Sequence, residues 1–491
     1  MNGINLVQYR LNGLSRLFLK LSFTAVMIIF SIIYCMSADA HQISISCDST
    51  ASTESSEFEL KKHPMQENRS ANTSSHECNV NDFTKAEKHA RLLDCFPDEC
   101  VAGYVYEVIL KNGPCDDDKL TNYTLSDADV EAIHNCTAID ISRKCCEDLS
   151  GIQNFIHLKF LDCSNNDILS IDVTKCTELE SLDCSYNSKI ANIDVSKCVR
   201  LKNFDCSDTN ISTIDVTRCT ALEELNCSNT LISDLNVCEC ADLKTLYCNN
   251  TDINELDVSA CCNLISLNFA DTNICSIDVS NLTKLSLLIC YNTELSEIDI
   301  SNLANLSLLD CSDTKIKDLD ISHCVKLKEL LCSRTKLSKL DVNNTTKLEV
   351  LDCSSNKISS LDVFYLTKLY SLNCSHTNIT ELDVSYCPSL YKLDCSFTDI
   401  SKLDVYYCTK LRKLNCSFTN ISSLNVCRLS ELCELNCSET KLSTLDVSYC
   451  TRLLDLNCSN TNIEIINIYS LSELRCLVYS KTAIISCAYG N

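Results

Sequence analysis

From Leu158 to the end of the chain, apolar and polar positions recur with a period of 21 residues. Each unit reads L-x-x-L-[DN]-C-S-x-[TN]-x-[IL]-x-x-[LI]-[DN]-[VI]-x-x-[CL]-x-x. The sixteen units begin at Leu158, Leu179, Leu201, Leu222, Leu243, Leu264, Leu285, Leu306, Leu327, Leu348, Leu369, Leu390, Leu411, Leu432, Leu453 and Leu474. A fixed period of this length is the sequence signature of a solenoid.

The pattern within one unit predicts its shape. L-x-x-L-x-C places apolar groups on a short strand that faces the interior. The Thr or Asn that follows ends the strand, because its side chain can bond to nearby backbone. The apolar residues of the second half supply the opposite wall, and stacking buries what one unit alone leaves exposed. Residues 137–141, with Leu149, Ile152 and Phe155, form a divergent first unit.

We therefore predict a leucine-rich-repeat, right-handed solenoid over residues 137–491, with parallel strands on its concave face and about 17 units of 21–22 residues. The segment 81–136 is predicted to be a small N-terminal helical cap. Residues 96–99 suit a helix start, and Ser126 to Asp129 precede a second apolar helical pattern like a cap.

The N-terminus has the composition of an export segment. Basic residues precede an apolar run from Leu21 to Met36, and Ser37 to Ala40 form a cleavage site of small residues. Residues 1–40 are predicted to be a signal peptide or an uncleaved signal anchor, and residues 41–80 a disordered spacer rich in Ser, Asn, Glu and Thr. The protein is accordingly predicted to be secreted or held at the cell surface, with membrane contact only through an uncleaved N-terminal segment.

Composition narrows the function classes. A net charge of -24, from 66 acidic and 42 basic residues, repels phosphate backbones and excludes nucleic acid as a natural partner. The chain has 39 Cys but only 6 Gly and 4 Pro, and the repeats after Gly151 contain no Gly before Gly490. Their turns must therefore use another repeated device.

The cysteines fall in two columns of the repeat. The first column holds Cys163, Cys184, Cys206, Cys227, Cys248, Cys290, Cys311, Cys332, Cys353, Cys374, Cys395, Cys416, Cys437 and Cys458, and the second holds Cys176, Cys198, Cys219, Cys240, Cys261, Cys324, Cys387, Cys408 and Cys450. Phe269 and Tyr479 fill the gaps in the first column, which indicates that it needs a buried apolar group.

We predict a structural ladder of free thiols. Cβ atoms on in-register parallel strands lie about 4.8 Å apart, beyond the usual disulfide range, and a line of thiols does not converge on a metal. The cap cysteines Cys95, Cys100, Cys115 and Cys136 are better disulfide candidates, with their pairing left open.

The unit L-x-x-L-D-C-S-x-N-x-I-x-x-L-D-V-S resembles the internalin-like leucine-rich repeats of bacteria, of the cysteine-ladder type found in internalin J. Residues 96–98, 125–129, 139–141 and 149–152 occur in the order that such proteins use ahead of their repeats. The resemblance implies a surface or secreted protein that binds host or cell-surface partners. Thr stands in most units where the family has Asn.

Candidate partner-binding residues are apolar groups at positions that face outward on the concave side. They are Tyr247, Leu287, Ile289, Leu308, Leu331, Val350, Tyr370 and Tyr391. Exposed apolar patches usually mark contacts, although a few such positions can also simply tolerate Leu. Phe397 and Phe418, with Tyr406 and Tyr407, are a second possible patch near the repeat edges.

The outward position before the first cysteine column is mostly Asp or Asn. It holds Asp162, Asp183, Asp205, Asn226, Asn268, Asp310, Asp352, Asn373, Asp394, Asn415, Asn436 and Asn457. The column indicates either a solvated strand face or an acidic groove for a basic partner.

No catalytic constellation, metal site or cofactor motif is found in the sequence, so we expect no enzyme and no cofactor. The functional hypothesis is a non-catalytic protein-protein interaction module, an adhesin or host-interaction factor whose partner is a protein bound through the concave face. The alternative is a structural surface-coat protein that self-associates.

Overall fold

The computed structural model describes residues 90–480 and 483–486, which lie within one compact unit. The predicted signal segment and spacer fall outside these residues. In the described part of the chain, no helix is long and apolar enough to span a membrane.

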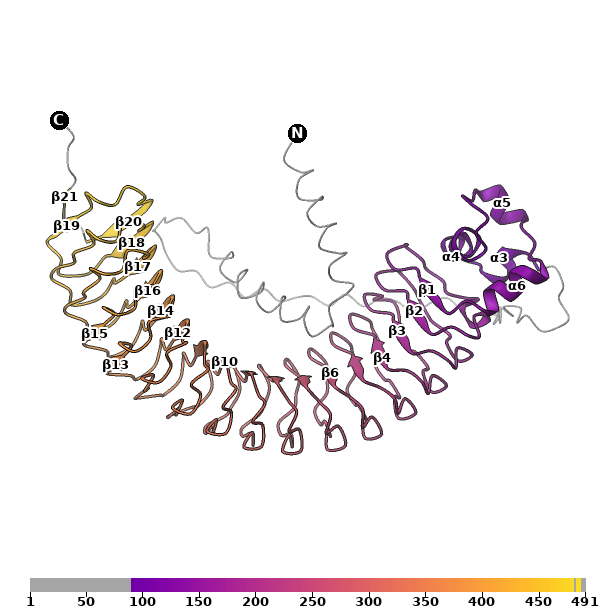
Figure 1. The fold of residues 1–491 in the computed structure, drawn as a ribbon, viewed down its shortest axis with the longest axis horizontal. Coiled ribbons are helices and arrows are strands. Elements are labelled where there is room, and N and C mark those ends of the chain that lie inside the picture. Colours follow the sequence, from indigo (N-terminus) through magenta and orange to yellow (C-terminus); the bar gives the residue numbers. More distant parts are fainter. Residues whose placement is uncertain (1–89, 481–482, 487–491) are drawn as a thin grey trace, which may run out of the picture. The chain divides into compact units, whose positions relative to one another are not determined.

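Short helices precede the repeats, as the sequence predicted (Figure 1). They are α3 (Leu92–Cys95), α4 (Glu99–Tyr104), the π-helix η2 (Val105–Ile109), α5 (Asp117–Asn122) and α6 (Asp127–His134). The predicted starts are confirmed: Asp98 caps α4 by accepting from the backbone of Cys100 and Val101, and Ser126 forms a capping box with Asp129 at α6.

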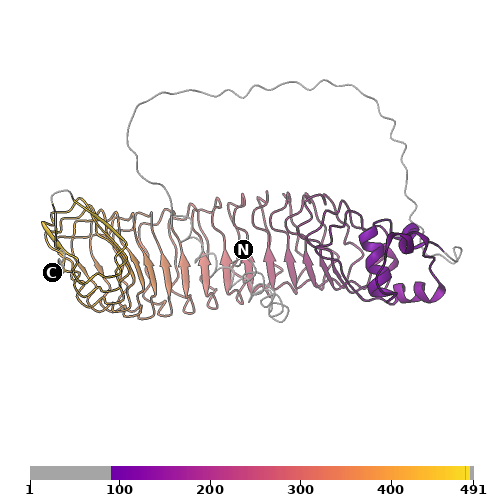
Figure 2. The ribbon, with the colours of Figure 1, turned by 90° about the horizontal axis from the view of Figure 1, so that it is seen from above.

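The repeats form one parallel sheet of 17 strands, which confirms the predicted number of units (Figure 1). The strands are β1 (Ala138–Asp140), β2 (Phe160–Asp162), β3 (Ser181–Asp183), β4 (Asn203–Asp205), β5 (Glu224–Asn226), β6 (Thr245–Tyr247), β7 (Ser266–Asn268), β8 (Leu287–Ile289), β9 (Leu308–Asp310), β10 (Glu329–Leu331), β11 (Val350–Asp352), β12 (Ser371–Asn373), β14 (Lys392–Asp394), β16 (Lys413–Asn415), β17 (Glu434–Asn436), β18 (Asp455–Cys458) and β20 (Cys476–Tyr479). Figure 2 shows them side by side along the array.

The opposite wall is mostly irregular. It contains the 3-10 helix η3 (Ile152–Asn154) and two small parallel sheets, β13 (Leu382–Asp383) with β15 (Leu403–Asp404), and β19 (Ile465–Asn467) with β21 (Ile484–Ser486). In Figure 1 the large sheet lines the inner side of the curve and β13 and β15 lie on the outer side.

Neighbouring strands pair without register shift, so each column of the sequence is a column in space. Leu161 pairs with Leu182, and Leu182 with Phe204. The central residue of each three-residue strand is buried, whereas its two neighbours face the concave side. A one-residue slip would expose the buried set, which fixes the register.

The turns replace glycine with a left-handed residue of another type. The residue after each C-S pair has φ between 51° and 56°, from Asn165 to Asn460. Its backbone N–H donates to a carbonyl of the next turn, as from Tyr186 to Ser207 at 3.0 Å. Left-handed backbone costs a residue with a Cβ roughly 1–2 kcal/mol, and these inter-turn bonds offset the cost in the repeats from Asn165 to Glu439.

The Thr or Asn that follows closes the turn in two different ways. Thr209 Oγ1 donates to the carbonyl of Cys206 within its own turn, at 2.7 Å. Asn356 instead joins neighbouring turns, because its Nδ2 donates to the carbonyls of Cys332 and Cys353 and its Oδ1 accepts from the backbone N–H of Leu337. The substitution of Thr for Asn in most units therefore removes side-chain bonds between turns.

The cap joins the first repeat through Asp98 and Gly151. Asp98 Oδ2 accepts from the backbone N–H groups of Glu147 and Asp148, at 2.8 and 3.1 Å. Gly151 has φ 102°, and a Cβ there would lie 2.1 Å from the carbonyl oxygen of Cys95. Only glycine fits where the chain at residue 151 passes the backbone of Cys95.

Both cysteine columns are buried free thiols, as predicted. In the first column, Cys163 Sγ donates to the carbonyl of Asp183 at 3.3 Å. In the second column, Cys176 Sγ donates to the carbonyl of Ile152 at 3.7 Å. Each column thus fills the core and supplies weak bonds between turns. The cap differs from expectation, since Cys100, Cys115 and Cys136 are also free thiols. The Cys136 thiol donates instead to the backbone carbonyl of Ala138.

Candidate functional site

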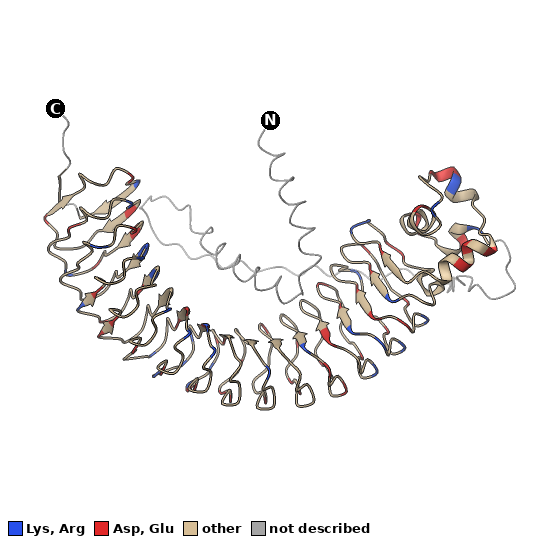
Figure 3. Ribbon diagram, viewed as in Figure 1, with Lys and Arg blue, Asp and Glu red and all other residues tan. Residues whose placement is uncertain are grey.

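The concave face is divided into zones along the array, and in the first zone lysines pair with glutamates on neighbouring turns. Figure 3 marks where Lys, Arg, Asp and Glu lie along the ribbon. At the position before each strand, Lys202 bonds Glu180 at 2.8 Å, and Lys244 bonds Glu223. Opposite charges in this column pair across neighbouring turns, and exposed pairs of this kind contribute little stability.

The Asp and Asn column has a structural role. Asp183 Oδ1 accepts from both the backbone N–H and the hydroxyl of Ser185, at 3.0 and 2.7 Å, and Asn226 makes the same pair of bonds to Ser228. These bonds order the chain as it leaves each strand. Burial raises the pKa of Asp183 to about 6, with a further contribution from the neighbouring carboxylate of Asp205.

Apolar residues form a central zone on strands β8 to β11. Leu287 pairs with Leu308 on the adjacent strand, and Ile289 lies two residues along from Leu287. Leu331 and Val350 extend the zone across the next two strands, and all five side chains are partly exposed. Ile265, just before β7, is 41% exposed and adds to the zone. Ile265 occupies the same repeat column as Tyr370 and Tyr391, so comparing the columns would have found it.

Tyr247 does not belong to this surface, contrary to prediction. Only 3% of it is exposed, and its hydroxyl lies 3.0 Å from the hydroxyl of Ser266 on the next strand. Thr245, Ser266 and Asn268 around it are small or short and are themselves buried. The ring therefore lies over the neighbouring strand and cannot contact a partner.

Tyrosine and arginine form the third zone. Tyr370, 48% exposed, stacks on Tyr391 with ring centroids 4.8 Å apart. Arg412, on the turn after Tyr391, lies over the Tyr391 ring, with its guanidinium carbon 5.6 Å from the ring centroid. It also forms an ion pair with Glu431 at 3.1 Å. Tyr and Arg are the residues that most often anchor interfaces. Arg412 occupies the same repeat column as the two tyrosines, so comparing the columns would have found it.

The predicted second patch separates into two. Phe397 and Phe418 stack at 4.2 Å, together with His376, at the left-handed turns that follow the concave strands. Tyr406 and Tyr407 instead follow β15 of the opposite wall, where Arg428 lies 4.2 Å from the centroid of Tyr406. The first group is exposed although bulky residues are rare in left-handed turns.

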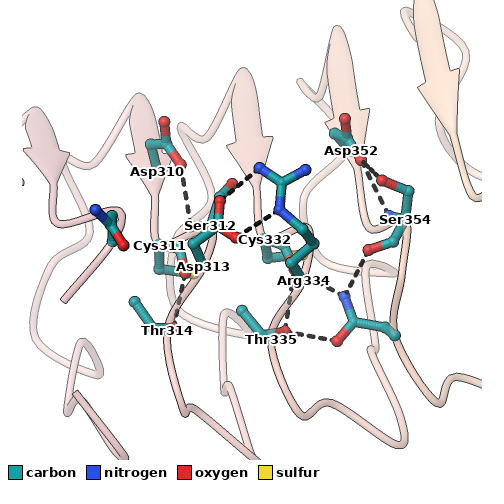
Figure 4. A network of polar contacts seen from close by, with 12 residues as sticks. Asp310, Cys311, Ser312, Asp313, Thr314, Cys332, Arg334, Thr335, Asp352 and Ser354 are labelled. Atoms are coloured by element: carbon teal, nitrogen blue, oxygen red, sulfur yellow. Dashed lines mark hydrogen bonds and ion pairs between the residues drawn. The ribbon is translucent and has the colours of Figure 1, made fainter. Parts of the chain in front are cut away.

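A polar groove of about 540 Å³ runs along the same turn edge over the middle repeats. Figure 4 shows its ion pair, between Arg334 and Asp313 on adjacent turns, beside Asp310 bonded to Ser312. Lys315 and Lys336 also line the groove, and Lys315 pairs with Glu294 on the adjacent turn. Most of the charge in the groove is therefore paired within the chain.

The ladder thiols are not arranged for nucleophilic chemistry. Burial raises the pKa of Cys176 and of Cys416 to about 12, so these ladder thiols stay protonated at neutral pH. Among the described residues, one group of His, Cys, Asp or Glu side chains is close enough to hold a metal ion, formed by Asp98, Cys100 and Cys146 in the cap joint.

The comparisons agree with this architecture. The family model described as Leucine Rich repeats (2 copies) matches residues 156–198 and 346–386. No curated protein matches the chain. The functional domain of InlJ from Listeria monocytogenes, which includes a cysteine ladder, is 28% identical with a TM-score of 0.65, over 79% of both chains.

Two further solved structures share the fold. The internalin InlF from Listeria monocytogenes is 22% identical, with a TM-score of 0.57, over 70% of this chain and 100% of that one. The plant peptide hormone receptor RGFR1, solved in complex with RGF2, is 17% identical, with a TM-score of 0.58, over 71% of this chain and 67% of that one.

Proposed function

We propose that this internalin-like leucine-rich repeat protein is a non-catalytic binding protein that recognises a protein partner through the concave face of its solenoid. The binding surface comprises the central apolar zone and the adjoining tyrosine and arginine zone. The protein acts as an adhesin or host-interaction factor, secreted or held at the cell surface.

The observation that carries the proposal is the local break in the repeat. The unit places Asp or Asn at the last concave position of most strands, but Ile289 and Leu331 replace it on β8 and β10. Leu287, Leu308 and Val350 are added on the same face of β8, β9 and β11. None of these five side chains is fully buried, so core packing does not demand them.

The neighbouring aromatic zone fits the same role. Stacked tyrosines beside an arginine combine a large apolar area with hydrogen-bonding groups, which suits a protein surface. Lys202 and Lys244 in the charged zone nearer the cap, like Arg412 in the aromatic zone, are already paired with glutamates, so a partner that engages them would have to break existing ion pairs.

The test is a pull-down from host-cell surface extract with the full chain, followed by affinity measurement on the captured partner. The test variant carries Leu287→Ser, Ile289→Ser, Leu308→Ser and Leu331→Ser. We expect it to bind at least about tenfold more weakly than the parent. A matched control carries Phe160→Ser and Asn203→Ser, which lie on the same face near the cap, and it should bind like the parent.

Three outcomes would refute the proposal. Equal binding by the test variant, folded by circular dichroism, would move the site off the central zone. Weaker binding by the control alone would place it near the cap. Concentration-dependent self-association that the four substitutions abolish, with no partner captured, would favour the structural coat.

A further inference from the structure

The joint between the cap and the first repeat holds two thiols next to a carboxylate. Cys100 lies in the first turn of α4, and Cys146 follows β1 in the first repeat. Their sulfur atoms and a carboxylate oxygen of Asp98 all lie within 4.8 Å of one another. Residues far apart in the sequence are thus brought together where two structural units meet.

A metal ion is a poor fit to this cluster. Asp98 Oδ1 already accepts from the backbone N–H groups of Cys100 and Val101, and Oδ2 accepts from those of Glu147 and Asp148. Four donors occupy the lone pairs of the carboxylate. Zinc would be left with two thiols, fewer protein ligands than structural or catalytic zinc sites use.

The two thiols differ in access. Cys100 is exposed and its Sγ contacts the carbonyl oxygen of Lys144 at 3.2 Å, whereas Cys146 is fully buried. Its neighbour Cys145 is exposed and has left-handed backbone, but its thiol is not part of the cluster. An external reagent therefore reaches Cys100 first, and Cys146 is the nearby thiol placed to react with the product.

We propose that Cys100 and Cys146 form a disulfide that clamps the cap to the first repeat when the protein meets an oxidising environment. This step rests on the proposed export of the protein for its setting. The two sulfur atoms, which lie within 4.8 Å of each other, must approach to a bond length of about 2.05 Å.

The chemistry needs a small-molecule disulfide as oxidant. The Cys100 thiolate attacks one sulfur of glutathione disulfide, which breaks the S–S bond, forms a mixed disulfide and releases one glutathione thiolate. The Cys146 thiol, whose pKa burial raises to about 12, passes its proton to the released glutathione thiolate, and its sulfur attacks the Cys100 sulfur and displaces the second glutathione. Two protein thiols are oxidised, two glutathione molecules are formed, and the two thiol protons pass to the released thiolates.

The link would secure a joint that is otherwise held by hydrogen bonds and packing. It closes a loop over residues 100–146, which contains most of α4 together with η2, α5, α6 and β1. Terminal caps shield the end of a solenoid core, so a covalent clamp keeps the first repeat covered even when the cap helices open locally.

The test equilibrates the purified, reduced full chain in a buffer of reduced and oxidised glutathione, followed by non-reducing peptide mapping. We expect a peptide linking residues 100 and 146, and a Tm a few degrees above that of the reduced protein. Cys145→Ser should behave like the parent. Cys100→Ser should lose the link and the Tm gain, and Cys146→Ser should carry glutathione on Cys100.

Other outcomes overturn the proposal. Both thiols staying reduced while exposed Cys238 carries glutathione would show that the pair does not close. A link from Cys100 to Cys145 would assign the wrong partner. Protection of both thiols from alkylation by Zn²⁺ alone, without a link, would make the cluster a metal site. None of these readouts depends on a binding partner, so they are independent of the proposed function.

Discussion

The stacked carboxylates at the start of the array lead to a specific prediction for Asp183→Asn. Asp183 lies between Asp162 and Asp205 on adjacent strands, with no basic residue in their column. Asn occupies the same column in Asn226 and keeps both bonds to the following Ser. The substitution therefore removes a buried charge without removing a structural bond.

The sign follows from the raised pKa. The pKa of Asp183 is about 6 in the folded protein against 3.8 for an ordinary aspartate, so the folded state binds the proton more tightly than the unfolded chain. Below about pH 4 both states are protonated and stability is unaffected. As the pH rises through about 6, stability is lost, by up to about 3 kcal/mol for this difference.

The assay is urea unfolding followed by circular dichroism at about pH 4 and about pH 8. We expect Asp183→Asn to be more stable than the parent at the higher pH and equal to it at the lower. Asp394→Asn is the matched control, because Asp394 lies between Asn373 and Asn415 and accepts from Asn415 at 3.0 Å. An equal gain at both pH values, or a gain in the control, would refute the reasoning.

Three other changes test the fold. Gly151→Ala should destabilise the protein by about 2–4 kcal/mol in urea unfolding, since the methyl group collides with the backbone of Cys95; an unchanged midpoint would contradict the tight crossing. Asn356→Ala should cost about 1–3 kcal/mol and more than Asn356→Thr, because only Thr still closes its own turn; equal losses would show that this bond adds nothing. Thiol-reactive reagents should modify Cys238 and Cys262 in the native protein within minutes and leave the ladder untouched until unfolding; early ladder labelling by mass spectrometry would contradict burial.

The repeat architecture was predictable because its pattern is over-determined. Leu at the position of Leu182 and Cys at the position of Cys184 recur in unit after unit. A register shift of one residue would turn all of these buried side chains to solvent. The capped starts of α4 and α6 were equally predictable, since capping depends on residues close in the sequence.

The remainder depended on contacts that the unit pattern does not contain. Tyr247 is buried because Ser266, on the next strand, leaves space for its ring. Phe397 adopts a left-handed turn that its own side chain disfavours, and the bond to Ser417 on the next turn maintains it. Cys146 reaches Cys100 only after the cap has docked.

The unshifted pairing of the strands also bears on how such an array changes over generations. Gain or loss of one 21-residue unit displaces every later repeat by a single strand spacing, about 4.8 Å, and turns no side chain to another face. Recombination between similar repeats would therefore lengthen or shorten the distance between the paired-charge zone and the aromatic zone in equal steps. The length of the binding surface can thus change by whole strand spacings, while the packing inside each turn stays the same.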